Sequence, residues 1–478
     1  MNRRQFFEIS GGAVIAARFL RAATQDDSVM ATLSAYMAAA RNRALPPEVV
    51  EKTKHHILDT FAAMISGSTL APGKLGINFA RVHQGERVAT VAASNVLCGP
   101  MEAAMANGML AHSDETDDSH AASHSHPGCA VVPAALAAAE DFGNVDGQRF
   151  LRAVTLGYDI GTRVTMTLGG LPFQMETHRS AHSIAGTFGA SAAAASAAGL
   201  NVKQMRWVLD YASQQASGIA AWQRDTDHIE KSLVFAGMPA RNGVTAALLI
   251  QMGGTGVEDV FSGADNFLVG FAPKADPTGL VDKLGERYEV TRTSIKKWTV
   301  GSPIQAPLDA IGNIRKRRPF EAGDVSKVVV RIATSEAKTV NNREMPDISL
   351  QHMVAVMLMD KTASFAAAHD RARMQNPALL RERAKVELVP DDELERLYPQ
   401  RVTIVEITLA DGAKLTERVE AVRGTPDNPM SREEVVAKAR DLMTPVLGAA
   451  KSASLIDKVL AMETITNVRE LRPLLQSA

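Results

Sequence analysis

The chain has 478 residues, of which 46% are hydrophobic and 22% are charged, a composition typical of a soluble globular protein too long for one core. Because 52 Lys and Arg residues balance 53 Asp and Glu residues, the formal charge of -1 excludes a general attraction to nucleic acid or to membrane surfaces. No apolar run predicts a membrane span, and a small aromatic fraction of 5% with many alanines favours closely packed helices.

The first 26 residues have the layout of a twin-arginine export signal. Paired arginines, Arg3 and Arg4, precede a short and weakly apolar run at residues 9–17. The pattern predicts a signal segment at residues 1–26 and therefore a periplasmic protein. Two further arginines follow the run, and no clear Ala-x-Ala cleavage site is present, so the alternative is a basic terminus that stays on a cytoplasmic protein.

Residues 27–272 are expected to form the first part of a helical domain. The segment 45–68 starts with two prolines, which are favoured at a helix start, and places its apolar residues at helical spacing. Residues 95–115 are expected to form a helix that leads into a polar segment, and residues 128–143 are expected to form the next helix. The run 186–200 is so rich in alanine and glycine that it is expected to pack closely against its neighbours.

After residue 272 the amino-acid composition changes, and runs of β-branched residues appear. These runs are residues 325–334, 383–391 and 401–422. In the last run, apolar residues alternate before Ala-Asp-Gly, a turn signal that predicts a β-hairpin. Residues 273–425 are therefore expected to form a smaller α+β domain. After a linker, Ser431 is a candidate N-cap for a final helical part, residues 426–478, that folds back onto the first.

Residues 112–128, HSDETDDSHAASHSHPG, form a polar exception between two buried helices. Crowded carboxylates repel one another, which raises carboxyl pKa values toward acid–base use, and histidine titrates near neutrality. A catalytic or substrate-binding cluster, a metal site and a solvated loop all fit this pattern. The metal site would use His120 and His124, four residues apart, with His126 as a third ligand, although the Pro-Gly after His126 ends any regular helix.

Basic residues near helix starts form a second candidate group. Lys231 precedes a long apolar helix, and Lys296 and Lys297 precede a Gly-Ser-Pro helix start. His178 and His182 precede the alanine-rich helix. Cations ahead of helix N-termini hold anions, so this recurring arrangement suits a substrate with several carboxylates. For Lys231 the alternative is an exposed lysine with no ligand.

The two cysteines, Cys98 and Cys129, are expected to be small buried hydrophobic residues. Two cysteines in so long a chain do not make a disulfide framework, and they exclude a cysteine-based zinc site.

Taken in order, these motifs resemble the MmgE/PrpD family, which includes 2-methylcitrate dehydratase and cis-aconitate decarboxylase. The segment 45–68 resembles the family's opening helix. Residues 112–140 resemble its signature, a His-x-x-Asp-Phe-Asp-Asp-Thr-His stretch followed by His-Pro-Gly. The resemblance covers nearly everything from about residue 30 to residue 470. It implies a mainly α fold with a helical domain built from both chain ends and an inserted α+β lid domain. It also implies a homodimer and chemistry on di- or tricarboxylates without a cofactor or metal.

The resemblance also implies an acid–base group. His126 is the expected acid or base, and Asp117 or Asp118 is its orienting partner or the second acid–base residue. Ser119, which stands at the family's usual threonine, is expected to line the same site.

Further residues match family positions that bind or position the substrate. Lys231 matches the family lysine, and Lys297 roughly matches the lysine before the lid helix, so both are expected to hold carboxylates. His182 is the nearest match to a family histidine and is expected to be catalytic, with His178 as the alternative.

Besides Ser119, further positions depart from the family pattern. Glu115 stands where the family usually has Asp, and Phe235 follows Lys231 where a histidine is expected. Gln305 falls where many members carry a histidine, and its amide binds substrate but does not transfer protons at neutral pH. We expect Glu115 and Gln305 to bind substrate, and these exchanges weigh against both methylcitrate and cis-aconitate.

The expected function is a cofactor-independent lyase, either a dehydratase or a decarboxylase, that removes a proton next to a carboxylate of a small di- or tricarboxylate. An isomerase or epimerase needs the same proton abstraction without a leaving group and is the first alternative. An exported carboxylate-binding protein without turnover and a metal-dependent hydratase are the others.

Overall fold

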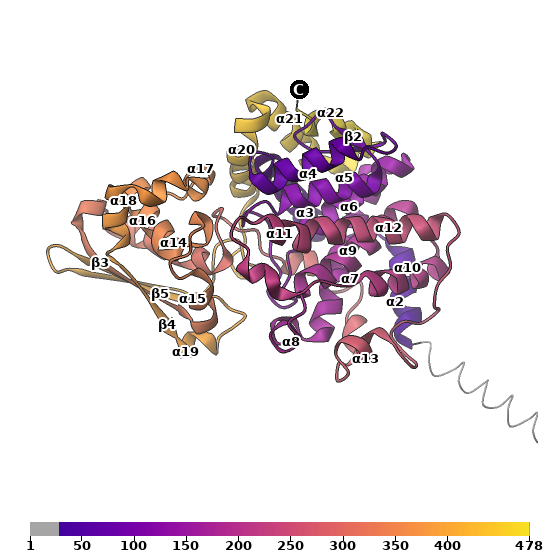
Figure 1. Ribbon diagram of the computed structural model, residues 1–478, viewed down its shortest axis with the longest axis horizontal. Helices are drawn as coiled ribbons and strands as arrows, with labels where there is room; N and C mark the ends of the chain where they lie inside the picture. The colour runs from indigo at the N-terminus through magenta and orange to yellow at the C-terminus, as the bar shows by residue number, and fades with distance from the viewer. Residues whose placement is uncertain (1–27, 478) are drawn as a thin grey trace, which may run out of the picture.

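The computed structural model describes residues 28–477 and contains two hydrophobic cores. The larger core joins residues from Met30 to Ile295 with residues from Met430 to Leu475. The smaller core lies within residues 300–422. Figure 1 shows the two corresponding parts of the chain: a large helical part, which contains both ends of the described chain, and a smaller lid part with a sheet.

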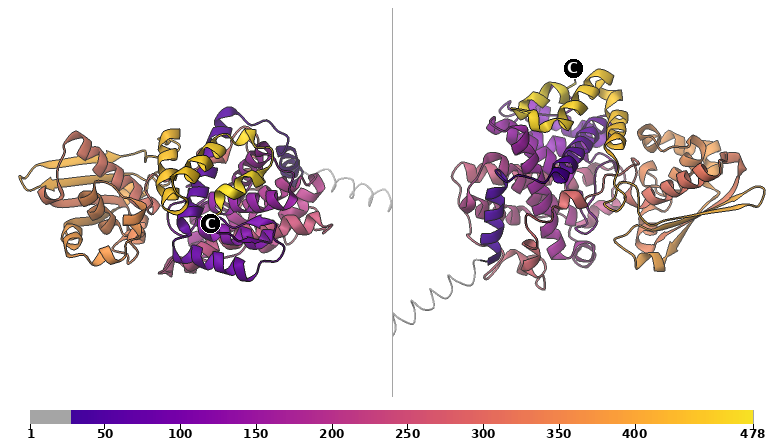
Figure 2. Two further views of the ribbon diagram at one scale, coloured as in Figure 1. Left: turned by 90° about the horizontal axis from the view of Figure 1, so that it is seen from above. Right: turned by 180° about the vertical axis from the view of Figure 1, so that it is seen from behind.

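The helical part brings together helices from both ends of the chain. Its helices are α2 (Ser28–Ala40), α3 (Pro47–Gly67), α4 (Ala71–Val82), α5 (Pro100–Ala111), α6 (Gly128–Phe142), α7 (Gly147–Leu168), α8 (Gly170–Thr177), α9 (Ala181–Ala198), α10 (Val202–Gln215), α11 (Ile229–Ser232), α12 (Met238–Gln251), α13 (Phe267–Phe271), α20 (Arg432–Leu447), α21 (Ala449–Leu460) and α22 (Arg472–Leu475). A short antiparallel ribbon of β1 (Ala89–Thr90) and β2 (Leu97–Cys98) precedes α5. Figure 2 shows the C-terminal helices lying across the N-terminal ones, where α20 packs against α3.

Small residues let the central helices of this part lie close together. α9 packs against α6, α7 and α12. A methyl group added at Gly157 of α7 would lie 2.8 Å from the carbonyl oxygen of Gly189 of α9. The close packing expected for residues 186–200 is thus confirmed. Among the described helices, the run Ile229–Gln251 is the one long and apolar enough to cross a membrane, but it is 56% buried and packs against α5, α6 and α9, as a core helix does.

The lid part is a four-stranded mixed sheet with helices packed on it. Its strands are β3 (Val325–Ala333), β4 (Val386–Asp391), β5 (Thr403–Leu409) and β6 (Lys414–Val419), in the order β4-β3-β5-β6. β3 pairs in parallel with β4, and the other two pairs are antiparallel. Its helices are α14 (Ser302–Arg317), α15 (Thr334–Val340), α16 (Leu350–Asp360), α17 (Phe365–His369), α18 (Pro377–Arg383) and α19 (Asp392–Glu395). α14 and α16 both contact the sheet.

Most of the predicted elements are confirmed. α3 begins at Pro47, and the side chain of Ser431 accepts the Glu434 amide at the start of α20. β5 alternates buried and half-buried residues before the predicted hairpin turn. The helix expected over residues 95–115 is shorter, because Leu97–Cys98 pairs as a strand and helical structure starts only at the following Pro100.

The change of core falls later than the domain boundary expected at residue 273. Leu280, Tyr288, Val290 and Ile295 all pack in the larger core, and the smaller core starts at Val300. The two cysteines are free and buried, as expected. The signal segment expected at residues 1–26 lies outside the described residues.

Candidate active site

The acidic part of residues 112–128 forms the buried connection between α5 and α6. Asp114, Glu115, Asp117 and Asp118 are between 0% and 4% exposed. The solvated-loop interpretation is therefore wrong. Because an ionised carboxylate without a partner is costly to bury, each of these acids needs donors or cations around it, and the structure supplies them.

Asp117 lies at the centre of this connection, between two histidines. Its Oδ2 is 2.9 Å from Nδ1 of His112, and its Oδ1 is 3.2 Å from Nδ1 of His126. The ammonium group of Lys296 lies 3.6 Å from the same Oδ1. Burial raises the pKa of Asp117, but the two imidazoles and the ammonium group outweigh burial and hold it well below its usual range.

Glu115 is held in the same way by two lysines. Lys231 donates to its carboxylate, and Lys296 lies 3.5 Å from that carboxylate while donating to the Glu115 carbonyl at 2.9 Å. Burial raises the pKa of Glu115, but the two ammonium groups bring it well below its usual range. The expectation that crowding raises the carboxyl pKa values is therefore wrong for Glu115 and Asp117, because cations stand between the acids.

His126 and His182 meet across an aromatic cluster. Their ring centroids are 5.2 Å apart, and Phe235 stacks on His182 at 3.8 Å. Phe235 belongs to a π-helical turn, Leu233–Gly237, between α11 and α12, a local feature common at functional sites. Burial lowers the pKa of both histidines, that of His182 by more, so both rings are neutral at neutral pH. Of the two candidates near α9, His182 enters the cluster, whereas His178 is exposed at the C-cap of α8.

Asp118 faces a different set of partners from its neighbour Asp117. Its Oδ2 accepts from the Tyr158 hydroxyl at 2.5 Å and faces Nδ1 of His56 at 2.8 Å. Its Oδ1 accepts the Gly128 amide at 3.0 Å, at the first residue of α6. Asp118 therefore anchors the connection to α3, α6 and α7, and the structure does not bring it to a cavity.

Two predicted substrate-binding residues have their polar groups bound to other residues of the protein. Lys297 lies 3.3 Å from Asp309, and its neighbour Lys296 is the lysine that reaches the acids. Gln305 donates to the carbonyls of Trp298 and Val300 at 2.7 and 2.8 Å, so its amide holds the backbone before α14.

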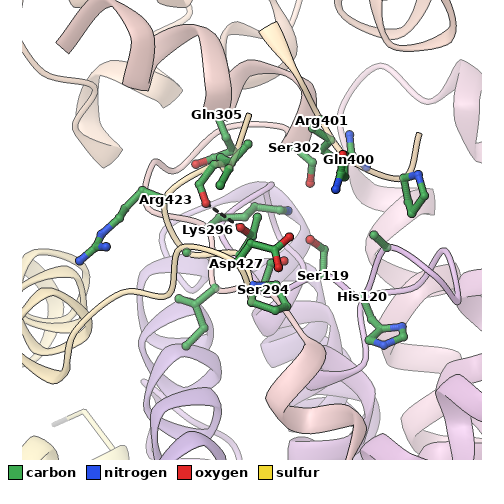
Figure 3. A pocket seen from close by; sticks show the side chains of 18 of the residues that line it. Ser119, His120, Ser294, Lys296, Ser302, Gln305, Gln400, Arg401, Arg423 and Asp427 are labelled. Carbon is green, nitrogen blue, oxygen red and sulfur yellow. Dashed lines mark hydrogen bonds between the residues drawn. The ribbon is translucent and has the colours of Figure 1, made fainter. Parts of the chain in front are cut away.

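Two adjoining cavities separate the helical part from the lid part. The inner cavity, of about 360 Å³, is lined by Glu115, His126, His182 and Lys231 on the helical side. The outer cavity, of about 270 Å³, is lined by Ser119, Lys296 and Gln305 among others. Ser302 and Arg401 line both. Figure 3 shows the outer cavity, with Lys296 extending toward the side of Ser302 and Arg401.

Several residues in or behind the cavity walls were not predicted from the sequence. His112 opens the polar segment but lies at its edge, and it binds Asp117. His228 stands three residues before Lys231 and lies 3.9 Å from the Glu115 carboxylate. Arg401 lies in the lid with no surrounding motif. Lys231 lies inside α11. The prediction that it precedes a helix start is therefore wrong.

The three histidines proposed as metal ligands do not converge. Nδ1 of His120 faces the Ser123 hydroxyl at 2.8 Å, and its Nε2 faces Glu289 at 3.3 Å. Within residues 28–477, possible metal ligands come together in two different groups: His112, Asp117 and His126, and His112, Glu115 and His228. The acid of each group already lies beside ammonium groups, which repel a cation at the same place.

Comparison with known families decides the relationship that this geometry suggests. The family model for the MmgE/PrpD N-terminal domain matches residues 31–279, and that for the MmgE/PrpD C-terminal domain matches residues 298–463. The chain belongs to the MmgE/PrpD family.

Relatives of this MmgE/PrpD chain match it over most of their length. A cis-aconitate decarboxylase of Homo sapiens is 27% identical over 463 residues, covering 90% of this chain and 91% of that protein. The corresponding enzyme of Mus musculus is 26% identical over 455 residues, covering 90% of this chain and 89% of that protein. The cis-aconitate decarboxylase-like protein oryM of Aspergillus oryzae is 24% identical over 485 residues, covering 95% of this chain and 98% of that protein.

Proposed function

We propose that this protein is a lyase that removes a proton next to a carboxylate of a small di- or tricarboxylate and then expels water or carbon dioxide. The observation that carries the proposal is a neutral imidazole, His126, held against the buried, ionised Asp117 at the wall of a cavity that also presents Lys231. The names of the relatives, which act on cis-aconitate, support the substrate class.

His126 is the base in this proposal. In this mechanism Nδ1 of His126, which lies 3.2 Å from the Asp117 carboxylate, carries the ring proton, and Nε2 carries the lone pair that accepts a proton from the substrate carbon. The neighbouring carboxylate stabilises the imidazolium that forms. Because burial lowers the pKa of His126, the ring is in its basic form at neutral pH before substrate binds.

The lysines hold the substrate and stabilise the charge that develops. When the proton leaves, the electron pair moves into the adjacent carboxylate and gives it enolate character. Lys231 and Lys296 both contact Glu115, and a substrate carboxylate beside Glu115 would share these ammonium groups. Burial lowers the pKa of Lys296, but Glu115 and Asp117 outweigh burial and raise it, so this lysine stays charged.

The second half of the reaction returns the electron pair. In dehydration, the pair forms a carbon–carbon double bond as hydroxide leaves, and the imidazolium of His126 or a group near His182 protonates that hydroxide to water. In decarboxylation, the imidazolium of His126 first returns its proton to another carbon of the delocalised carbanion; carbon dioxide then leaves, and the electron pair of the broken carbon–carbon bond takes a second proton, from solvent, at the carbon that held it. Apart from this solvent proton, every group that these steps need is a side chain of this chain, so the proposal includes no cofactor.

A solvent-exchange assay tests the proposal. Purified protein, treated with a chelator, is incubated in D₂O with a panel of di- and tricarboxylic acids and followed by NMR. We expect deuterium at the carbon next to a carboxylate together with loss of water or carbon dioxide, and neither in His126→Gln. Exchange that yields only a new isomer would identify an isomerase. Ligand-induced shifts without exchange would identify a binding protein, and exchange only after metal is restored would contradict the metal-free mechanism.

A further inference from the structure

Arg401 occupies a special place between the two cavities. It precedes β5 in the lid part. Of the described residues, Arg401 and Ser302 are the two that line both the inner and the outer cavity. Figure 3 shows it projecting from the lid side beside Gln400, whereas Arg423 points away from the centre of the cavity. His126 and Lys231 belong to the opposite, helical wall.

Only one end of the Arg401 guanidinium is engaged. Its Nη1 donates to the buried carboxylate of Glu336, and the side chain is 21% exposed. Among residues 28–477, Glu336 is its sole hydrogen-bond and ion-pair partner, which leaves Nε and Nη2 as donors. A guanidinium fixed at one end presents its remaining donors in a planar fork, which matches a carboxylate.

The surroundings of Arg401 favour an anion. Its charge acts on Glu115, and it lowers the pKa of His124, after the larger effect of burial, to about 3. On the same wall, Arg343 lines the inner cavity with no ion-pair partner among the described residues. The lid wall therefore has more cations than Glu336 neutralises. Ser302 is the first residue of α14, and no side chain caps this helix start after Gly301. The backbone amides of the first turn are therefore free to attract an anion.

We propose that Arg401 binds a substrate carboxylate remote from the reacting carbon, and that it selects for substrates with three carboxylates over those with two. This inference rests on the proposed function, because it assumes that His126 and the lysines of the helical wall hold the reacting end. Each wall then contacts a different end of the substrate. The helical wall carries out the proton transfer, and Arg401 of the lid wall binds the distal carboxylate.

The contribution of Arg401 can be measured with two unreactive ligands that differ by one carboxylate. Tricarballylate has three carboxylates, and methylsuccinate is the same molecule with one terminal carboxylate removed. Calorimetry measures both affinities for the wild type, Arg401→Gln and Arg401→Lys, with Arg423→Gln as a control for the loss of one positive charge at the same cavity. Arg423 suits this role because it is already bound to Glu434 and Asn428. Circular dichroism and melting temperature establish that each variant is folded.

We expect Arg401→Gln to weaken tricarballylate about 10–100-fold, the cost of a lost hydrogen bond between charged groups, and to change methylsuccinate by less than about threefold. Arg401→Lys restores part of the loss, and Arg423→Gln changes neither ligand. Equal losses for both ligands, or no loss for tricarballylate, would overturn this inference alone. A wild type that binds neither ligand would overturn it together with the proposed function.

Discussion

The two walls of the inner cavity are built in different ways. On the helical wall, Asp117 is fully buried and surrounded by His112, His126 and Lys296, so its position is determined from several sides. On the lid wall, Glu336 is the one hydrogen-bond and ion-pair partner of Arg401 within the described chain, with the Tyr398 ring 5.8 Å from its guanidinium carbon, and Arg343 has no ion-pair partner there. Proton transfer needs atoms held at hydrogen-bonding distance, whereas carboxylate recognition tolerates mobile cations. If the proposed assignments hold, proton transfer and carboxylate selectivity are located on opposite walls and can be changed separately by mutation.

The largest effect is expected from His126 on the helical wall. His126→Gln keeps an amide in place of the ring but removes the proton acceptor, so the exchange rate measured by NMR falls by about 10²–10⁴-fold. His178→Asn is the matched control, because His178 is exposed and its left-handed backbone, with φ of 58°, suits asparagine. If His126→Gln retained the wild-type rate, the helical wall would not carry the proton transfer.

The next largest effect is expected from Lys231 and distinguishes it from Lys297. Lys231→Met removes an ammonium group from Glu115, and kcat/KM is expected to fall about 10–100-fold. Lys297→Met removes an ammonium group that pairs with Asp309, and kcat/KM is expected to stay within about threefold of wild type. Steady-state kinetics on the substrate found by the exchange assay measures both. A reversed order would assign the carboxylate contact to Lys297.

Asp118 tests whether neighbouring acids of the helical wall have separate tasks. Asp118→Asn weakens its bonds to Tyr158, His56 and the Gly128 amide and is expected to lower the free energy of unfolding by about 2 kcal/mol. Urea denaturation measures this loss. The folded variant is expected to retain exchange activity, and a stable but inactive variant would instead place Asp118 in the chemistry.

The smallest effect concerns a contact that joins the lid part to the helical part. His369 of the lid lies 3.0 Å from Asp114, and its Nδ1 faces the Phe365 carbonyl at 2.7 Å, so both ring nitrogens face acceptors and the ring carries two protons. Burial lowers the pKa of His369, but Asp114 and then Asp347 outweigh burial and raise it from 6.5 to about 9.

Because the pKa of His369 is higher in the folded state, the stabilisation is complete below pH 6.5 and is lost as the pH rises through about 9. His369→Gln is therefore expected to lower the free energy of unfolding by about 1–2 kcal/mol near pH 6 and by little above pH 9. Denaturation curves across this pH range provide the measurement. A difference that does not depend on pH would show that the imidazolium charge contributes nothing.

The sequence predicted the helical wall better than the lid wall, for physical reasons. Periodicity and prolines identify helices, and the polar residues 112–128 stood out between apolar ones. Spacing did not separate Lys296 from Lys297, because the two are adjacent outside any helix or strand, and only the packed structure places Lys296 beside Asp117 and Lys297 beside Asp309. Arg401 carried no local signal at all, because its role depends on the packing of the lid against residues almost three hundred positions away.

One buried contact has a consequence for how the protein is made. Lys438 of α20 donates to the carbonyl of Thr116 at 2.9 Å and lies 2.6 Å from Asp59 of α3. A ribosome delivers Thr116 and its neighbours long before Lys438, and the whole lid is synthesised in between. The nascent chain therefore holds its acidic connection without this anchor until the last helices emerge. A chain truncated before α20 would therefore contain His126, Lys231 and Arg401 but would lack the lysine that ties the acidic connection to α20.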